Sequence, residues 1–306
     1  MIFTKNLFYF LILSLFRYGI AAEMDSLPTA QFEIQTNHPG AAIDIYYPLA
    51  LELKKYTTIV ILQGGRIDKS NYSHFASLLG SQGFIVAIAN TPWNFGPIDL
   101  GDFPDTAIVN QTFHAVLSEG ANAQSPLFNK VDPDRMGLVG HSFGGVTALM
   151  ALDLTCTTSL PFCREPYQRR PELQAAVVLN TKSSLGPFSV TFHSNGIPVA
   201  FIAGSQDGKS SLTDVTATYQ LATPPKALMT IQGANHFCMT NLNGASGAIP
   251  DARSPLLSQE NCNQKAAYWT ALYLNAYLNA NGLAYETLIK SQSNPPEGIQ
   301  IELDLK

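Results

Sequence analysis

Residues 135–152 read Arg-Met-Gly-Leu-Val-Gly-His-Ser-Phe-Gly-Gly-Val-Thr-Ala-Leu-Met-Ala-Leu, and this stretch decides the fold. Its short apolar run at 136–139 predicts a strand, and the Ala, Leu and Met residues after the glycines are typical of a helix. Gly140 and Gly144 lie two positions before and after Ser142, where a sharp strand-to-helix turn leaves no room for side chains. The stretch therefore predicts a nucleophile elbow that exposes the Ser142 hydroxyl.

Strand and helix patterns alternate over the rest of the chain. Strands are predicted at 31–34, 42–47, 57–62, 84–89, 175–179, 199–203 and 228–232, and helices at 72–79, 107–117 and 264–279. The first two strands read as an antiparallel pair, whereas the later solid apolar runs are typical of strands buried on both faces. We expect one α/β domain over 23–306, with a mostly parallel central sheet and helices on both faces.

Three segments fall outside this pattern. Residues 91–105 are rich in Pro, Gly and aromatic residues and are too irregular for an element. They are interpreted as a wall of a substrate cleft, with Trp93 and Phe95 as contacts, and a plain crossover loop is the alternative. Residues 155–171 are an insertion after the elbow helix, and residues 291–306 are expected to form a surface tail.

The composition limits the class of protein and its compartment. The 306 residues are 46% hydrophobic and 13% charged, with a formal net charge of −5, so the chain lacks the basic surface of a nucleic-acid partner. Residues 1–22 contain Lys5, a long apolar run and two final alanines, which is the pattern of a secretory signal peptide. An uncleaved anchor is disfavoured because the run is shorter than the ~20 residues that span a bilayer. A secreted or periplasmic protein without a stable membrane span is expected.

The cysteines fit an exported protein. Four of them follow the predicted signal, and an even number in such a chain indicates disulfides. The sequence allows three pairings, of which Cys156 with Cys163 and Cys238 with Cys262 is the most economical; buried free thiols are the alternative. A metal site is not expected, because there is no Cys-x-x-Cys pair and no histidine repeats beside the cysteines.

A serine nucleophile needs a base to accept its proton and an acid to orient that base. Asp207 follows the strand at 199–203, and His236 follows the strand at 228–232. The order Ser, Asp, His is the one that an elbow of this kind requires. Asp207 could instead cap a turn, with Asp214 as the alternative acid, and His236 could be an ordinary loop histidine. The joint occurrence of all three after their strands favours a catalytic triad.

The oxyanion of an acyl-transfer intermediate needs two hydrogen-bond donors. One is the backbone N–H of Phe143, directly after the nucleophile. The other is expected from the loop after the strand at 57–62, where Gly65 is the first choice and Arg66 the second; a plain turn is the alternative. A phosphate-binding loop is rejected here, because Asp68 stands where that motif requires glycine.

These motifs resemble the branch of the α/β-hydrolase superfamily that contains platelet-activating-factor acetylhydrolases, cutinase-type polyester hydrolases and chlorophyllase-like enzymes. The resemblance covers most of 42–279 and rests on the segments 67–86, 125–127, 131–135, 140–145 and 233–238. It implies an α/β-hydrolase fold and a carboxylic ester hydrolase that forms an acyl-enzyme, without metal or organic cofactor. The expected partner is a small-molecule or lipid-like ester.

Two departures from the polyester hydrolases affect the predicted substrate. Those enzymes usually carry an aromatic residue where this chain has Gly65, which weakens the prediction of a polymer substrate. The cysteine-bearing insertion at 155–171 is a second departure and could narrow the cleft toward smaller or lipid-like esters. Three alternatives stay open: an acetylhydrolase- or lipase-type lipid ester hydrolase, an exported peptidase, and a catalytically silent hydrolase fold used for binding.

Overall fold

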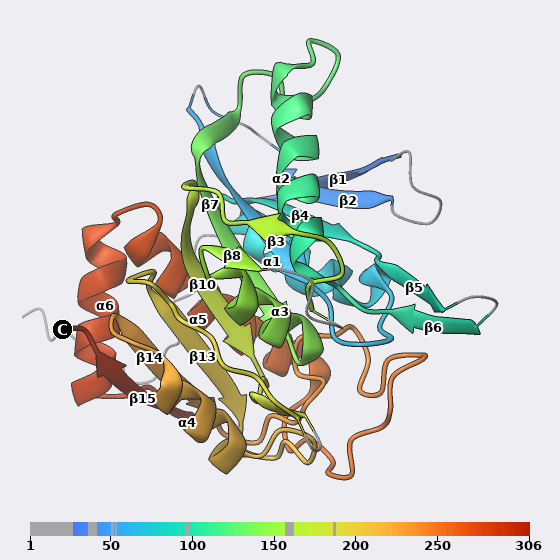
Figure 1. Cartoon of the computed structure of the whole chain (residues 1–306). Helices are drawn as coiled ribbons and strands as arrows, with labels where there is room; N and C mark the ends of the chain where they lie inside the picture. The colour runs from blue at the N-terminus through green and yellow to red at the C-terminus, as the bar shows by residue number, and fades with distance from the viewer. Residues whose placement is uncertain are drawn as a thin grey trace, which may run out of the picture.

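A nine-stranded sheet forms the centre of the protein, as seen in a computed structural model that describes residues 27–35, 42–49, 52, 54–95, 98–156, 162–185 and 188–306 (Figure 1). Its strands lie in the order β1 (Thr29–Ile34), β2 (Ile43–Pro48), β4 (Ile85–Ala89), β3 (Tyr56–Leu62), β7 (Val131–His141), β10 (Leu173–Leu179), β13 (Val199–Gly204), β14 (Lys226–Ile231) and β15 (Ile299–Asp304). The strands from β4 to β14 in this order pair in parallel, and β1, β2 and β15 pair antiparallel at the edges. The predicted mostly parallel sheet is confirmed.

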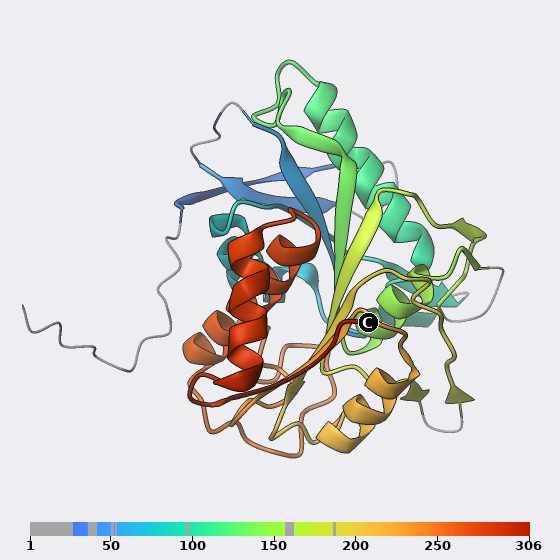
Figure 2. The same cartoon turned by 90° about the vertical axis from the view of Figure 1, so that its left-hand side faces the viewer.

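Helices cover both faces of this sheet, and Figure 2 shows the C-terminal helices on one side of it and the green helices on the other. One face carries α1 (Ser73–Ser81), α5 (Gln259–Tyr277) and α6 (Gly282–Ser293). The opposite face carries α2 (Thr106–Ala121), α3 (Phe143–Ala151) and α4 (Leu212–Leu221). Every residue of β3 is buried, with Ile59 and Ile61 in the first core and Val60 and Leu62 in the second. Burial on both faces is the reason for the solid apolar strand runs.

The structure differs from the sequence prediction in two segments. The segment at 91–105 is not irregular throughout, because β5 (Pro92–Phe95) and β6 (Ile98–Asp102) form an antiparallel hairpin. The prediction of a surface tail at 291–306 was wrong: α6 continues to Ser293, and β15 pairs with the open edge of β14. Ile299 is buried in the core beneath that edge, which gives β15 an apolar anchor that its short alternating pattern did not reveal.

Two disulfide bonds have the predicted pairing, Cys156 with Cys163 and Cys238 with Cys262. The first lies in the insertion, where β8 (Thr155–Cys156) pairs with β9 (Tyr167–Gln168). The predicted signal peptide at 1–22 lies outside the described residues. Among the helices that the structure describes, none is long and apolar enough to cross a membrane.

The elbow is built by close backbone packing between β7 and α3. A Cβ atom added to Gly140 would lie 2.5 Å from Gly144 O, and one added to Gly144 would overlap the backbone of Leu62. A Cβ atom on Gly145 would overlap the Thr181 side chain. The glycines therefore let the helix approach the strand ends closely enough to hold Ser142 at the turn.

This packing predicts that Gly145→Ala lowers the free energy of unfolding by about 1 to 3 kcal/mol, because the added methyl group has no space. The matched control is Gly282→Ala, since Gly282 begins α6 and an added Cβ there meets nothing within 4 Å. The control should leave stability unchanged or raise it slightly, because alanine restricts the unfolded chain more than glycine does. Urea unfolding midpoints measure both changes, and equal stability of the two variants would contradict the packing argument.

Candidate active site

Ser142 occupies the turn between β7 and α3 in a backbone conformation that L residues rarely adopt, with φ 52° and ψ −115°. Its N–H donates to Leu179 O at 3.0 Å, and its carbonyl accepts the N–H groups of Gly145 and Val146. These bonds fix both sides of the residue. Strain of this kind is found where surrounding structure fixes a functional side chain.

The structure brings together the three side chains predicted as a triad. Ser142 Oγ lies 2.9 Å from His236 Nε2, and His236 Nδ1 lies 2.8 Å from Asp207 Oδ2. His236 and Asp207 are 2% and 1% exposed, so water competes little for these bonds. Because the carboxylate can only accept, Nδ1–H donates to it, and the Nε2 lone pair faces the serine hydroxyl.

The second oxygen of Asp207 is also satisfied, since Oδ1 accepts the N–H groups of Lys209 and Ser210 at 2.7 Å each. The carboxylate is thus fixed by its own loop as well as by the histidine. The alternative acid, Asp214, has a different structural role: it forms a capping box with Ser211 at the start of α4. Asp214 is therefore occupied at a helix end, and of the two candidate acids the structure brings Asp207 to the imidazole of His236.

The backbone of His236 is fixed at both its polar groups. Its N–H donates to Asp251 Oδ2 at 2.9 Å, and the other oxygen of Asp251 accepts the N–H of Gly208 at 3.0 Å. Asp251 therefore connects the histidine loop (residues 233–238), which carries His236, with the loop that carries Asp207. Sequence analysis missed Asp251, because it lies in a long segment with no periodic pattern that would place it.

Asn180 holds the other side of the histidine loop. Its amide nitrogen donates to the carbonyl oxygens of Asn235 and His236 at 3.1 and 3.0 Å, and its amide oxygen accepts the N–H of Gly204 at 2.8 Å. Asn180 directly follows β10 with φ 51°, a conformation that asparagine tolerates better than most residues. A polar residue at the end of a parallel strand was a usable sequence signal for this position.

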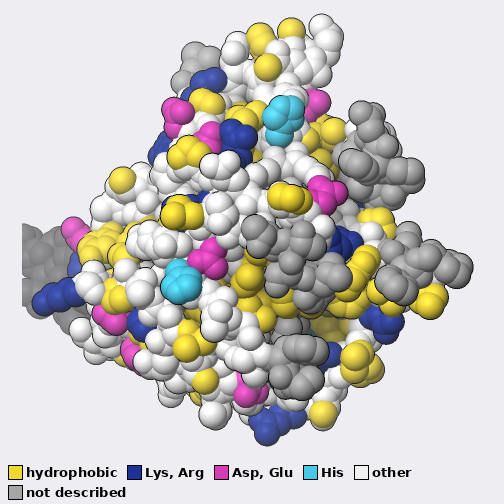
Figure 3. All heavy atoms as spheres, viewed as in Figure 1, with side chains coloured by type: hydrophobic (Ala, Val, Ile, Leu, Met, Phe, Trp, Pro, Cys, Tyr) yellow, Lys and Arg dark blue, Asp and Glu magenta, His cyan; other side chains and the backbone are white. Residues whose placement is uncertain are grey.

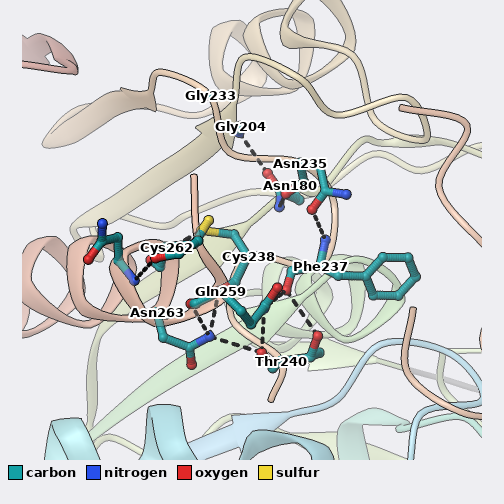
Figure 4. Close-up of a disulfide and its surroundings, with 12 residues drawn as sticks. Asn180, Gly204, Gly233, Asn235, Phe237, Cys238, Thr240, Gln259, Cys262 and Asn263 are labelled. Atoms are coloured by element: carbon teal, nitrogen blue, oxygen red, sulfur yellow. Dashed lines mark hydrogen bonds between the residues drawn. A yellow bond between two sulfur atoms is a disulfide. The ribbon is translucent and has the colours of Figure 1, made fainter. Parts of the chain in front are cut away.

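The disulfide between Cys238 and Cys262 joins the histidine loop to α5, with further side chains of that helix around it (Figure 4). Gln259 Nε2 donates to Phe237 O and Thr240 O at 2.7 and 2.6 Å. Asn263 Nδ2 donates to Cys238 O and Thr240 O at 2.9 Å each. The carbonyl groups that follow the histidine are thereby satisfied by one helix turn, and the loop is anchored without regular structure of its own.

The two predicted oxyanion donors are backbone N–H groups from different segments of the chain. Phe143 is the first residue of α3, so its N–H belongs to the free donors of a helix N-terminus. Within the described ranges, neither its N–H nor that of Gly65 donates to a protein acceptor. The N–H of the second choice, Arg66, donates to Asp102 O at 2.6 Å. Arg66 is therefore not available as a donor, and Gly65 remains the candidate.

Aromatic side chains surround Phe143. Its ring stacks on Phe162 with centroids 4.7 Å apart and meets the ring of Phe103 edge-on at 4.9 Å. The ring of Trp93, a predicted substrate contact, meets that of Phe103 with centroids 5.9 Å apart. Phe103 therefore lies between Trp93 and Phe143. The side chain of the other predicted contact, Phe95, is outside the described part of the structure. The hairpin and the insertion thus both reach the nucleophile region.

The departure at Gly65 has a steric reason. A Cβ atom added there would lie 2.6 Å from Phe103 Cε1, too close for any side chain larger than hydrogen while that ring stays in place. Phe103 comes from the segment after β6. The aromatic ring beside Gly65 therefore comes from the segment after β6 and not from position 65 itself.

Comparison with known proteins agrees with this geometry. A protein-family model described as PET hydrolase-like matches residues 21–249. The chain belongs to the PET hydrolase-like family. It is also similar to Cutinase est2 of Thermobifida alba, with 24% identity over 208 residues that cover 66% of this chain and 59% of the cutinase. The match thus spans about three fifths of the curated relative's length. The resemblance to cutinase-type α/β hydrolases and the fold class are confirmed.

The triad residues and the candidate oxyanion donors lie in the part of the chain that the structure describes. There, no group of three or more His, Cys, Asp and Glu residues could hold a metal ion. The groups that the site does offer are a hydroxyl, an imidazole, a carboxylate and two backbone N–H donors. This set can activate a nucleophile and stabilise an oxyanion.

The two hydrogen bonds that Asp251 accepts lead to a prediction about motion of the histidine loop. Asp251→Ala should raise the amide hydrogen-exchange rates of His236 and Gly208 by roughly tenfold, the equivalent of one lost hydrogen bond to a charged group. The matched control is Asp134→Ala, which removes an exposed carboxylate on β7. Hydrogen exchange read by mass spectrometry or NMR tests this, and unchanged protection at both amides would show that Asp251 does not hold the loop.

Proposed function

We propose that this protein is an exported serine carboxylic ester hydrolase that acts through an acyl-enzyme on Ser142. The observation that carries the proposal is the hydrogen-bonded series from Ser142 Oγ through His236 to Asp207, with distances of 2.9 and 2.8 Å. Membership of the PET hydrolase-like family and similarity to a cutinase support ester hydrolysis. The two disulfides and the signal-like residues 1–22 support export.

The first half of the proposed reaction forms the acyl-enzyme. The Ser142 hydroxyl attacks the ester carbonyl carbon while its proton passes to His236 Nε2. Asp207 stays ionised and stabilises the imidazolium that results. The N–H groups of Phe143 and Gly65 donate to the oxyanion of the tetrahedral intermediate. When this intermediate collapses, His236 returns the proton to the leaving alcohol oxygen.

The second half releases the acid. A water molecule replaces the alcohol and loses a proton to His236 Nε2 as its oxygen attacks the acyl carbon. The new intermediate uses the same two donors, and its collapse returns the proton to Ser142 Oγ and frees the carboxylic acid. Every group that this cycle requires comes from the chain itself, and the proposal names no cofactor.

The aromatic surroundings support an apolar ester as the substrate. Phe103 lies against Gly65 of the oxyanion loop (residues 63–66), and its ring meets those of Phe143 and Trp93. These rings would contact the acyl or alcohol part of the substrate. In the face shown in Figure 3, hydrophobic side chains gather to the right of the centre. A small or lipid-like ester fits this surface better than a charged substrate.

A lipid ester hydrolase is the second candidate, favoured by one specific feature. The loop after His236 exposes three large apolar side chains, Leu242, Ile249 and Leu256, which are 65%, 67% and 75% exposed. Large apolar groups on a loop beside an active site can contact a lipid surface. Measuring rates below and above the critical micelle concentration of a medium-chain ester separates the candidates, because only a lipase-type enzyme should accelerate on micelles.

The remaining alternatives receive less support from the geometry. A silent fold used only for binding needs no hydrogen bond between Ser142 and His236, and the buried hydrogen bond between His236 and Asp207 would serve no purpose there. A peptidase is disfavoured by the family comparison, which names ester hydrolases. Ester hydrolysis is therefore the activity to test first.

Ser142→Ala should reduce ester hydrolysis on the order of 10⁶-fold, to the background rate, since it removes the attacking oxygen. The assay is a p-nitrophenyl ester panel of rising acyl length on the mature protein, with a serine-directed phosphonate to label the wild type. Ser118→Ala is the matched control, because it removes an exposed hydroxyl on α2. Hydrolysis by a folded Ser142→Ala protein at the wild-type rate would refute the proposal.

Substitution of the two aspartates should show which one is the catalytic acid and which one only caps a helix. Asp207→Asn should lower kcat by about 10²- to 10⁴-fold, because the amide favours the wrong imidazole tautomer. Asp214→Asn keeps an oxygen for the cap of α4 and should leave kcat unchanged while shifting the free energy of unfolding by less than about 1 kcal/mol. Steady-state kinetics and urea unfolding of both variants give the answer, and the reverse pattern would make Asp214 the acid.

A further inference from the structure

A buried hydrogen-bond series joins the oxyanion loop to the histidine loop. Gly64 N lies 2.7 Å from Tyr72 Oη, Tyr72 Oη lies 2.9 Å from His141 Nδ1, and His141 Nε2 lies 2.9 Å from His236 O. Tyr72 and His141 are both fully buried. The triad uses neither side chain, although one stands directly before Ser142 and contacts the backbone of His236.

The chemistry of the end groups fixes every proton in this series. The carbonyl oxygen of His236 can only accept, so His141 Nε2–H donates to it. A neutral imidazole then has its lone pair on Nδ1, which accepts the O–H of Tyr72. The tyrosine oxygen is left to accept the N–H of Gly64. All the bonds run in one direction, from Gly64 to His236.

Burial keeps this arrangement in one protonation state. It lowers the pKa of His141 well below the ordinary histidine value, and the nearby His236 acts in the same direction. It also raises the pKa of the Tyr72 hydroxyl far above the usual tyrosine value. Both shifts favour the neutral forms of the two side chains, which are the forms that the hydrogen-bond directions require.

The hydrogen-bond series ends at Gly64, the residue directly before the candidate oxyanion donor Gly65. Gly64 O accepts the N–H of Ile67 at 3.1 Å, and because a trans peptide points its C=O and N–H in opposite directions, the Gly65 N–H points away from Ile67. Tyr72 holds the preceding peptide through the Gly64 N–H. A Cβ atom on Gly64 would lie 3.0 Å from His141 Nδ1 and 3.3 Å from Tyr72 Oη. Gly64 of the oxyanion loop therefore packs directly against the Tyr72–His141 pair.

We propose that Tyr72 is a positioning residue, which acts through His141 to keep the oxyanion loop and His236 in fixed relation to Ser142. The proposal rests on the proposed function. In this proposal the hydroxyl group of Tyr72 helps to place both the oxyanion loop and His236, which come from distant segments of the chain. Tyr72 itself does not touch the substrate, and its loss should affect the transition state rather than substrate binding.

The test is Tyr72→Phe, which removes a single oxygen atom and keeps the ring. We expect kcat toward p-nitrophenyl esters to fall roughly tenfold to a hundredfold, because small displacements of catalytic groups are costly. KM should stay within about twofold, as expected for an interaction that acts on the transition state. The pH at which kcat/KM is half-maximal should not move, since Asp207 and His236 are unaltered.

The matched control is Tyr273→Phe. Tyr273 is also fully buried, on α5, and its hydroxyl has no hydrogen-bond partner in the described part of the structure. This control should leave kcat unchanged. A second readout is the inhibition constant of a trifluoromethyl ketone, which forms an oxyanion with the serine. In Tyr72→Phe the inhibition constant should rise by the same factor by which kcat/KM falls. In Tyr273→Phe it should stay constant.

A purely structural role would lower thermal stability in Tyr72→Phe without changing kcat or ketone affinity at a temperature where the variant is folded, and this outcome would overturn the proposal. Should Tyr72→Phe not fold, ¹⁵N NMR of the wild-type histidines decides. His141 must keep the Nε2–H tautomer from pH 5 to 9, and an Nδ1–H tautomer or a titrating ring would overturn the proposal. An active Ser142→Ala protein would refute the esterase itself, whereas an inactive Ser142→Ala with a wild-type-like Tyr72→Phe would refute only this inference.

Discussion

The structure depends on the fixed position of a histidine that no helix or strand carries. His236 must keep one ring nitrogen near Ser142 and the other near Asp207 while it lies in the long connection from β14 to α5. Its N–H is held by Asp251, and its carbonyl accepts hydrogen bonds from Asn180 and His141. Two of these three partners, Asn180 and His141, come from the carboxyl ends of parallel strands, which meet at one edge of the sheet.

The elbow imposes the second constraint, which is steric. Ser142 can stand at the turn only if α3 crosses the strand ends at a distance that excludes Cβ atoms at Gly140 and Gly144. That closeness also places the first turn of the helix, with its free N–H groups, beside the serine oxygen. The same two glycines thus serve the backbone geometry of the turn and the proposed oxyanion binding together. A looser crossing would weaken both at once.

The sequence predicted the parts that follow from strand order and failed where contacts are long-range. Ser142, Asp207 and His236 could be predicted because each follows its own strand, and parallel strands end at one edge. Asn180 obeys the same rule and was overlooked. Asp251 could not be found, since its place depends on how a segment without periodicity folds back over Gly208. The sequence predicts a tail where β15 lies, because only the pairing with β14 reveals this edge strand.

The aromatic side chains near Phe143 come from segments outside the central sheet, and one arginine connects these segments. Arg164 of the insertion donates to the carboxylate of Asp105 at 2.8 Å and to Phe103 O at 2.9 Å, and its guanidinium lies 5.5 Å from the Trp93 ring centre. Phe162, two residues before it, stacks on Phe143. The insertion therefore contacts Phe103 and Trp93 through Arg164 and packs against Phe143, one of the two proposed oxyanion donors. Substitutions in this segment should therefore disturb both the ring of Phe143 and the rings of Phe103 and Trp93, so we expect the proposed substrate range and the catalytic rate to change together.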